Sequence, residues 1–283
     1  MADLDLRPLS LGEILDRTFS IYRRNFLLFV GITAIPHLLV LALQLGQVLL
    51  TTSGGLRKTA PGNVMALGAI GLFAFLVGIV IYLVAYLFAH GGTVHAVSEL
   101  YLGRTASIGG SLRWMRGKAP GLFGVLALNG LAVGFATLCL IIPGIYVACR
   151  LITCVPAALL EDLGARDSLE RSWTLTKDNA GRSFVIYLLY FALLYGALLM
   201  FSFPFLIAIA FSAKDPAMIR TWMACSQIGN FVAAVLVTPI FTIAGTVFYY
   251  DLRVRKEAFD LQLMMNPRGN IVPAPSGVPT MFS

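Results

Sequence analysis

Charged residues are scarce in this sequence. Asp, Glu, Lys and Arg together make up 12% of its 283 residues, whereas hydrophobic residues make up 58%. A soluble globular domain contains roughly 25% charged residues. With a mean hydropathy of +0.82, the composition excludes an ordinary soluble protein and predicts a chain whose solvent is mostly lipid.

Sequence signatures of catalysis and of metal binding are also missing. The chain contains no HExxH, no GxSxG and no phosphate-binding GK[ST] loop. Near the end of the second apolar run, His90 and His95 are five residues apart, and only His95 and Glu99 have the i, i+4 spacing of ligands on one helix face. We therefore expect no catalytic residue, no metal and no cofactor, and we favour a protein that is not an enzyme.

Cysteine is rare and is not arranged for redox or metal chemistry. None of the four cysteines belongs to a CxxC pair, and all lie within apolar runs. We interpret them as small packing residues rather than as disulfide partners or metal ligands. They are Cys139, Cys149, Cys154 and Cys225.

Long apolar runs dominate what is present, and six of them approach the roughly 20 residues that a membrane-crossing helix needs. The predicted fold class is all-α, a polytopic membrane bundle of six transmembrane helices in a single membrane domain over residues 1–263. Residues 264–283 are rich in Pro and Gly, and we expect a disordered cytoplasmic tail there. The predicted spans are residues 26–50, 64–89, 122–142, 145–160, 184–211 and 222–250.

The segment before the first span has the pattern of an amphipathic helix over residues 10–24. Ser10 and Glu13 have the spacing of a capping box, in which each side chain satisfies the other residue's free backbone N–H. Arg23 and Arg24 follow at the end of the helix, at the level expected for lipid headgroups. Such a helix lies in the membrane interface rather than across the membrane. Its apolar face is predicted to contain Leu11, Ile14, Leu15, Thr18, Phe19 and Tyr22.

A similar arrangement recurs twice. Ser10 precedes Phe26, Ser107 precedes Phe123 and Ser168 precedes Phe184 by the same number of residues, with basic residues leading to each aromatic. We interpret this as three repeats of one unit, an interfacial helix followed by a helical hairpin. The second and third interfacial helices are predicted near residues 107–118 and 167–180.

The distribution of basic residues predicts the orientation. Of the 21 Lys and Arg residues, only Arg57, Lys58, Lys214 and Arg220 fall in the loops opposite the N-terminus. Because positively charged loops stay in the cytoplasm, we expect a plasma-membrane protein with both termini cytoplasmic. The basic excess is expected to contact anionic lipid headgroups, and it does not indicate nucleic acid. The predicted interface residues are Arg23, Arg24, Trp173, Lys177, Arg182, Arg253 and Arg255.

Arg150 is the one basic residue predicted to lie within a span. Counted from a turn at Pro143, it falls near the outer surface, and no carboxylate is predicted within the spans. Two interpretations remain open. Arg150 either contacts an anion inside the bundle or extends along the helix to the outer headgroups. The neutral polar residues expected near it are His37, Asn129, Gln227 and Asn230.

Two blocks of the sequence carry a resemblance. They are PGIYVACRLITCVPAALLEDLGARDSLERSWTLTKDNAGRSF, residues 143–184, and YYDLRVRKEAFDL, residues 249–261. The sequence resembles bacterial integral-membrane proteins related to the membrane domain of glycerophosphoryl diester phosphodiesterases. In that family the membrane domain can precede a soluble phosphodiesterase barrel. Only the short tail follows here, so the resemblance implies the membrane topology and not the phosphodiesterase activity.

Three functions remain compatible with the sequence. The first is a non-enzymatic membrane module that contacts lipid or docks a protein partner through its basic inner face. The second is a carrier or channel for a small anionic solute or lipid, with Arg150 as the anion contact. The third is an intramembrane enzyme, which the spans support least because they contain almost no acid or base. We favour the first.

Overall fold

The computed structural model describes residues 8–52, 64–212 and 215–257, and within these segments every regular element is an α-helix. The prediction of an all-α fold is confirmed. In chain order the helices are α1 (Leu11–Arg24), α2 (Phe26–Thr52), α3 (Val64–Tyr101), α4 (Ile108–Cys139), α5 (Ile141–Arg150), α6 (Cys154–Leu160), α7 (Ala165–Leu175), α8 (Ala180–Phe201), α9 (Phe203–Phe211) and α10 (Pro216–Glu257).

Six helical segments are long and apolar enough to cross a membrane, which confirms the predicted number of candidate spans. In four of them only 6–28% of the most apolar stretch is buried within the protein, as expected where lipid is the solvent, whereas 61% is buried in Ile141–Leu160 and in Ala217–Glu257. The segments are Phe26–Leu49, Gly71–Tyr101, Ile108–Cys139, Ile141–Leu160, Ala180–Phe201 and Ala217–Glu257.

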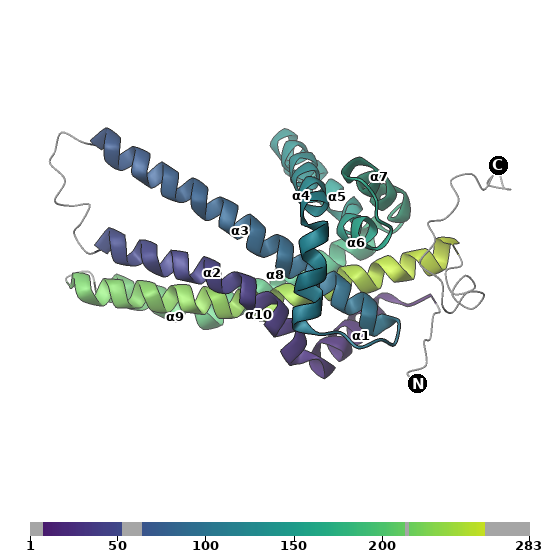
Figure 1. The fold of residues 1–283 in the computed structure, drawn as a ribbon, viewed down its shortest axis with the longest axis horizontal. Coiled ribbons are helices and arrows are strands. Elements are labelled where there is room, and N and C mark those ends of the chain that lie inside the picture. The colour runs from purple at the N-terminus through teal and green to yellow at the C-terminus, as the bar shows by residue number, and fades with distance from the viewer. Residues whose placement is uncertain (1–7, 53–63, 213–214, 258–283) are drawn as a thin grey trace.

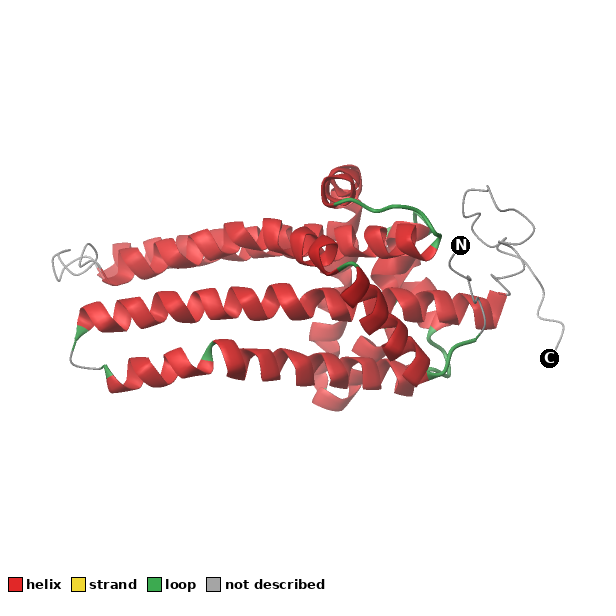
Figure 2. Ribbon diagram, turned by 90° about the horizontal axis from the view of Figure 1, so that it is seen from below, coloured by secondary structure: helices red, strands yellow, loops and turns green. Residues whose placement is uncertain are grey.

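The long helices define one axis of the molecule (Figure 1). Helices α2, α3, α8, α9 and α10 run along this axis, and α4 crosses it, so that α4 appears nearly end-on in Figure 2. We call the end at which α10 finishes the base, and the end at which α2 and α9 finish the far end. Helix α1 lies obliquely on the outside of the bundle, near the base.

The buried core lies towards the base. In α3 the residues from Gly71 to Val84 are largely exposed, whereas most residues from Ala85 to Tyr101 are buried. Helix α10 follows the same trend, because its buried hydrophobic side chains run from Ala233 to Val254. The far end therefore consists of helices whose exposed faces need lipid to cover them, while the base is packed like the interior of a soluble protein.

Two adjacent glycines lie where α3 approaches α4 and α2. A Cβ atom added to Gly91 would overlap Met115 Sδ and lie 3.0 Å from Leu122 Cδ2, both on α4. One added to Gly92 would lie 3.0 Å from Ile32 Cγ2 on α2. Only residues without side chains allow the helices to approach so closely. The pair that separates His90 from His95 in the sequence thus serves helix packing.

The second repeat differs from its prediction. The interfacial helix expected at 107–118 and the span expected at 122–142 form one continuous helix, α4. Ser107 caps its start by accepting a hydrogen bond from the Gly110 N–H, and no cap interrupts it before Leu140. The turn lies at Leu140 rather than at Pro143. Pro143 instead occupies the first turn of α5, where its missing N–H costs nothing.

Two predicted spans are broken by proline. The span at 145–160 is divided into α5 and α6 by a turn over residues 151–153, and Pro156 lies in the first turn of α6. Its ring clashes with the carbonyl four residues earlier, which prevents a continuous helix. Pro204 acts in the same way on the span at 184–211, where Ser202 separates α8 from α9.

The threefold repeat stays a prediction. Helix α1 has the predicted extent, and both hydrogen bonds of its capping box are present. Helix α7 corresponds to the third interfacial helix, but it begins and ends earlier than expected. The tail predicted at 264–283 lies outside the described residues.

Candidate functional site at the base of the bundle

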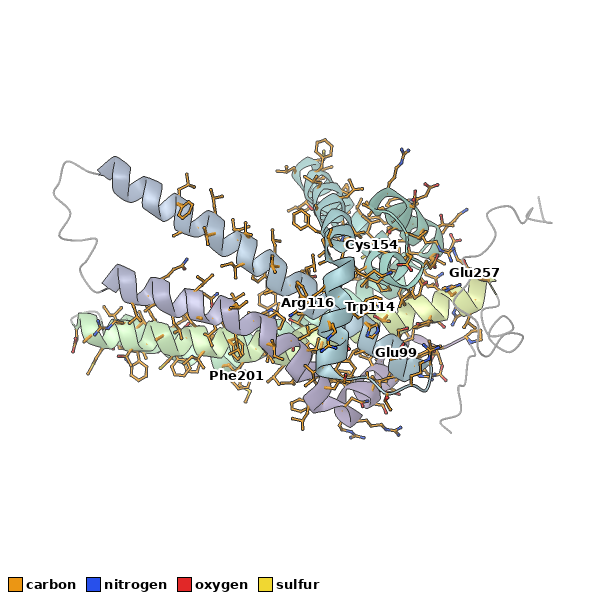
Figure 3. All side chains as sticks on the ribbon, in the orientation of Figure 1. Glu99, Trp114, Arg116, Cys154, Phe201 and Glu257 are labelled. Carbon is orange, nitrogen blue, oxygen red and sulfur yellow. The ribbon has the colours of Figure 1, made fainter. Side chains whose placement is uncertain are left out.

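Buried ion pairs connect the two sequence blocks at the base. Glu161, at the end of α6, accepts hydrogen bonds from Arg171 Nε at 2.8 Å and from the Tyr249 hydroxyl at 2.6 Å. Arg171 also pairs with Glu257 at 2.5 Å, and Arg253 Nε lies 3.0 Å from the same carboxylate. Glu257 marks the end of α10 in Figure 3. We call Glu161, Arg171, Tyr249, Arg253 and Glu257 the first network.

The first network keeps its charges although it is largely shielded from water. The Glu161 side chain is 4% exposed and that of Arg253 is fully buried. Burial acts to lower the pKa of Arg171, but its hydrogen bonds to Glu257 and Glu161 outweigh this and raise the pKa above its usual range. Arg171 therefore stays protonated at every accessible pH and remains a cation beside Glu161 and Glu257.

A second network fastens the chain preceding α1 to α10. Asp251 is 1% exposed and accepts a hydrogen bond from the Leu9 N–H at 2.7 Å. Its carboxylate also pairs with Arg182 at 2.8 Å and with Arg255 at 3.0 Å. Both guanidinium groups donate in addition to the Leu9 carbonyl. The backbone of Leu9 is thus held at its donor and at its acceptor.

These networks change the assignment of two predicted interface residues. Arg253 is buried, and the Arg182 side chain is 20% exposed. Both neutralise carboxylates inside the base instead of facing headgroups. The sequence analysis did not identify Glu161, Asp251 and Glu257 as buried residues, because it predicted every carboxylate to lie outside the spans. The Asp251–Arg255 and Arg253–Glu257 pairs have the i, i+4 spacing that could have indicated mutual pairing.

The remaining predicted interface residues lie at the surface. Trp173 is 41% exposed, and Arg255 is 35% exposed while paired to Asp251. Arg23, Arg24 and Lys177 are exposed.

Arg150 lies against α7, at the base of the bundle. Its Nη2 donates to the Trp173 carbonyl at 2.5 Å, and its guanidinium stacks on the Trp173 ring at 4.4 Å. In return, the hydroxyls of Ser172 and Thr176 donate to the Arg150 carbonyl at 2.9 and 2.8 Å. The C-terminal ends of α5 and α7 therefore satisfy each other's free carbonyl groups.

The structure does not bring Arg150 together with the polar residues expected around it. His37 contacts the Thr33 carbonyl of its own helix at 2.8 Å. Asn230 accepts a hydrogen bond from Ser202 at 2.8 Å, and Asn129 Oδ1 is buried without a hydrogen-bond partner. Asn230 also donates to Gln227 Oε1 at 3.4 Å. The hydrogen bonds described for Arg150 go to Tyr146 and Trp173, and none of them joins it to His37, Asn129, Gln227 or Asn230.

The candidate metal residues have other partners. His90 lies 2.7 Å from the Thr242 hydroxyl, and His95 stacks against Trp114. Within the described part of the chain, no three His, Cys, Asp or Glu side chains are grouped so that they could hold a metal ion.

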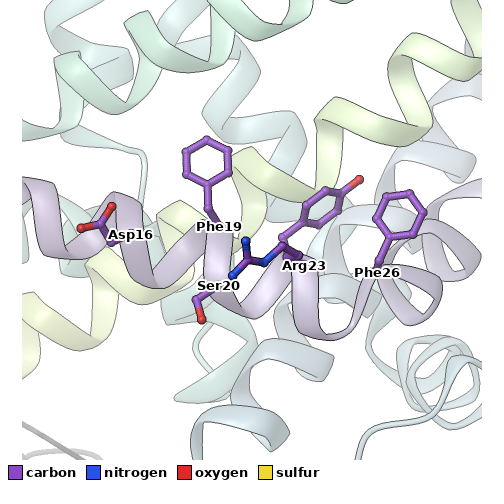
Figure 4. A pocket seen from close by; sticks show the side chains of 6 residues that line it. Asp16, Phe19, Ser20, Arg23 and Phe26 are labelled. Carbon is purple, nitrogen blue, oxygen red and sulfur yellow. The ribbon is translucent and has the colours of Figure 1, made fainter.

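An open groove runs along the exposed side of α1 (Figure 4). It has a volume of about 640 Å³ and combines aromatic rings with one guanidinium. Burial raises the pKa of Tyr22 to about 12, so its hydroxyl stays protonated, and it donates to the Leu236 carbonyl at 2.9 Å. The groove is lined by Asp16, Phe19, Ser20, Tyr22, Arg23 and Phe26.

Comparison with known proteins identifies one family. A family model described as "Membrane domain of glycerophosphoryl diester phosphodiesterase" matches residues 126–272. No curated protein and no solved structure matches the chain. The matched segment contains every side chain of both networks, together with Arg150 and α7.

Proposed function

The chain belongs to the family of the membrane domain of glycerophosphoryl diester phosphodiesterase, and we propose that it is a non-enzymatic membrane module whose base contacts anionic lipid headgroups. In this proposal the base faces the cytoplasmic leaflet of the plasma membrane. The proposal follows from the charge distribution of the sequence and from the shape of α1.

Helix α1 is the observation that carries the proposal. Ile14 and Thr18, on the inner face of α1, are fully buried, whereas Arg23 and Arg24 are exposed at its C-terminal end. Phe26 and Leu27, which follow directly, are 41% and 80% exposed. Exposed cations beside exposed apolar side chains fit the boundary between headgroups and acyl chains, where each basic residue contributes about 1 kcal/mol of attraction to an anionic surface.

The groove on α1 supports the same function. An acyl chain can lie against Phe19 and Phe26 while Arg23 meets the headgroup phosphate. The carboxylate of Asp16 lies at one end of the groove (Figure 4) and favours a position of the phosphate nearer to Arg23. Lipid is therefore the occupant that matches both the apolar and the charged parts of this surface.

The surroundings of Arg150 favour a membrane module over a carrier. A carrier built around this residue needs polar side chains from several spans beside it. The partners that Arg150 has in the described structure are Tyr146, on its own helix, and Trp173, on α7. Both networks, in addition, consist of paired charges, which suits a rigid support better than a path for ions.

Lipid-dependent stability tests the proposal. The purified full chain in neutral detergent is heated with phosphatidylglycerol or with phosphatidylcholine of identical acyl chains. We expect phosphatidylglycerol to stabilise the protein more strongly, and the double variant Arg23→Gln/Arg24→Gln to need about tenfold more of it for the same effect. The matched control Lys214→Gln/Arg220→Gln removes two cations that the topology assigns to the opposite side, and it should respond like the unmodified chain. Equal stabilisation of the unmodified chain by both lipids would contradict the proposal.

A further inference from the structure

Arg150 differs from the other shielded arginines at the base. Arg171, Arg182 and Arg253 each pair with a carboxylate. Arg150 is 7% exposed, yet no carboxylate among the described residues lies within ion-pair distance of it, and its Nε is buried without a hydrogen-bond partner. Burying a guanidinium without a counter-ion costs free energy, and an anion bound to it offsets that cost.

We propose that Arg150, Lys177 and Lys256 form a binding site for one phosphate group of an anionic lipid headgroup. The proposal deepens the proposed function, on which it rests, by assigning a specific site at the base to the lipid. The site lies between the C-terminal end of α5, the C-terminal end of α7 and the last turn of α10.

The three cations converge on the end of α7. Arg150 donates to the Trp173 carbonyl, and Lys256 Nζ donates to the carbonyls of Thr174 and Lys177, both at 3.0 Å. Lys177 follows directly on the Thr176 cap of α7, so its side chain starts from the same stretch of backbone. Positive charge is therefore concentrated within one turn of backbone.

Helix capping does not account for this concentration of charge. The C-terminal end of a helix carries the equivalent of about half a negative charge. Together with the single carboxylate of Asp178, it leaves the three cations incompletely neutralised. A phosphate supplies the missing negative charge and several acceptor oxygens.

The surroundings favour a phosphate at the level of the headgroups. Trp173 is 41% exposed and Tyr146 is 48% exposed, and their rings meet edge to face at 6.1 Å. Half-exposed Trp and Tyr side chains are typical of the membrane interface. Lys177 and Lys256 are exposed, and Lys256 Nζ donates to the Lys177 carbonyl, so the two lysines meet the phosphate first. Arg150 then offers its planar fork once the Trp173 ring shifts.

Trp173 provides a direct readout, because its ring lies on the guanidinium. In the background Trp114→Phe/Trp222→Phe, Trp173 is the one remaining tryptophan of the sequence. Short-chain phosphatidylglycerol, phosphatidylcholine and inorganic phosphate are titrated separately into the full chain in neutral detergent. We expect a saturable change in Trp173 fluorescence with phosphatidylglycerol that phosphatidylcholine does not produce.

Variants of the three cations identify the site. Arg150→Gln should weaken the phosphatidylglycerol response about tenfold or more, and Arg150→Lys should weaken it less, since the charge stays while the fork is lost. Lys177→Gln and Lys256→Gln should also weaken the phosphatidylglycerol response. Because they change exposed side chains, they test the site even if Arg150→Gln does not fold. Arg104→Gln is the matched control. It removes an exposed guanidinium that pairs with Glu99 at 3.3 Å, and it should leave the response unchanged.

The outcomes separate this inference from the proposed function. A response to phosphatidylglycerol that stays within about twofold in Arg150→Gln would show that Arg150 only caps α7. A response that stays within about twofold in both lysine variants would show that the lysines take no part. Either result would overturn the site of three cations. The stabilisation that depends on Arg23 and Arg24 would then remain. A saturable response to inorganic phosphate, with nothing added by the lipid, would support the phosphate site and contradict the lipid as its source.

Discussion

The Tyr249 hydroxyl donates a hydrogen bond of 2.6 Å to Glu161 Oε1, across 88 residues of sequence. This bond connects the last long helix, α10, to the end of α6, and both side chains are buried. It also connects the two sequence blocks that carry the family resemblance. The base is therefore a unit held together by buried polar contacts, and single changes within it should be costly.

Removal of the Tyr249 hydroxyl tests this bond. We expect Tyr249→Phe to lower the free energy of unfolding by about 1–2 kcal/mol, because one acceptor of Glu161 loses its donor while Arg171 remains. Reversible unfolding in mixed detergent micelles measures the change. Tyr195→Phe is the control, since Tyr195 is 61% exposed and should tolerate the change. Equal stability of the two variants would show that the bond contributes nothing.

The Arg171–Glu257 pair makes a second prediction. Arg171→Gln should cost about 3 kcal/mol, because it leaves two carboxylates shielded with less positive charge near them. The double variant Arg171→Gln/Glu257→Gln should be more stable than Arg171→Gln alone, since one of those carboxylates is then neutral. A double-mutant cycle on the same unfolding assay measures the coupling. Strictly additive losses would contradict the pairing.

The α4–α5 hairpin depends on a close approach at Gly144. A Cβ added there would lie 2.8 Å from Thr137 Cα, closer than such atoms normally come. Gly144→Ala should therefore destabilise the hairpin, whereas Gly134→Ala, with open space around its position, should be neutral or slightly stabilising. Thermal unfolding of the two variants makes the comparison. A neutral Gly144→Ala would contradict the hairpin geometry.

The sequence was sufficient for the class of fold and for the surface helix α1. The length of each apolar run determines whether its helix can cross a membrane. The Ser10–Glu13 capping box is a local signal that does not depend on distant contacts. Pro156 and Pro204 fall within the predicted spans 145–160 and 184–211, each of which was predicted as one continuous span. The structure has a turn before each proline, so each span consists of two helices.

Tertiary contacts explain why the site was less accessible to sequence reasoning. The carboxylates of Glu161 and Asp251 look solvated when each is considered within its own segment. They become interior only because Arg171 and Arg182, from distant positions, neutralise them. The position of Arg150 was counted from a turn expected at Pro143, whereas the structure has that turn at Leu140. Its contacts with Trp173 on α7 join residues 23 positions apart and are not visible within one segment.

The orientation of the chain gives a further prediction. Reporter fusions at Leu56, between α2 and α3, and after the last residue should lie on opposite sides of the membrane, with the second in the cytoplasm. Alkaline phosphatase and green fluorescent protein are suitable reporters, because each is active on one side only. Activity of the same reporter at both positions would contradict the orientation.

The depth of Trp173 in the bilayer tests the central claim, that the base meets the lipid headgroups. The Trp114→Phe/Trp222→Phe variant is reconstituted into bilayers that contain lipids spin-labelled either at the headgroup or deep in the acyl chain. We predict strong quenching of Trp173 fluorescence by the headgroup label and weak quenching by the deep label, because α7 lies at the base and its Trp173 ring is half-exposed. Stronger quenching by the deep label would place α7 within the hydrocarbon and contradict the account.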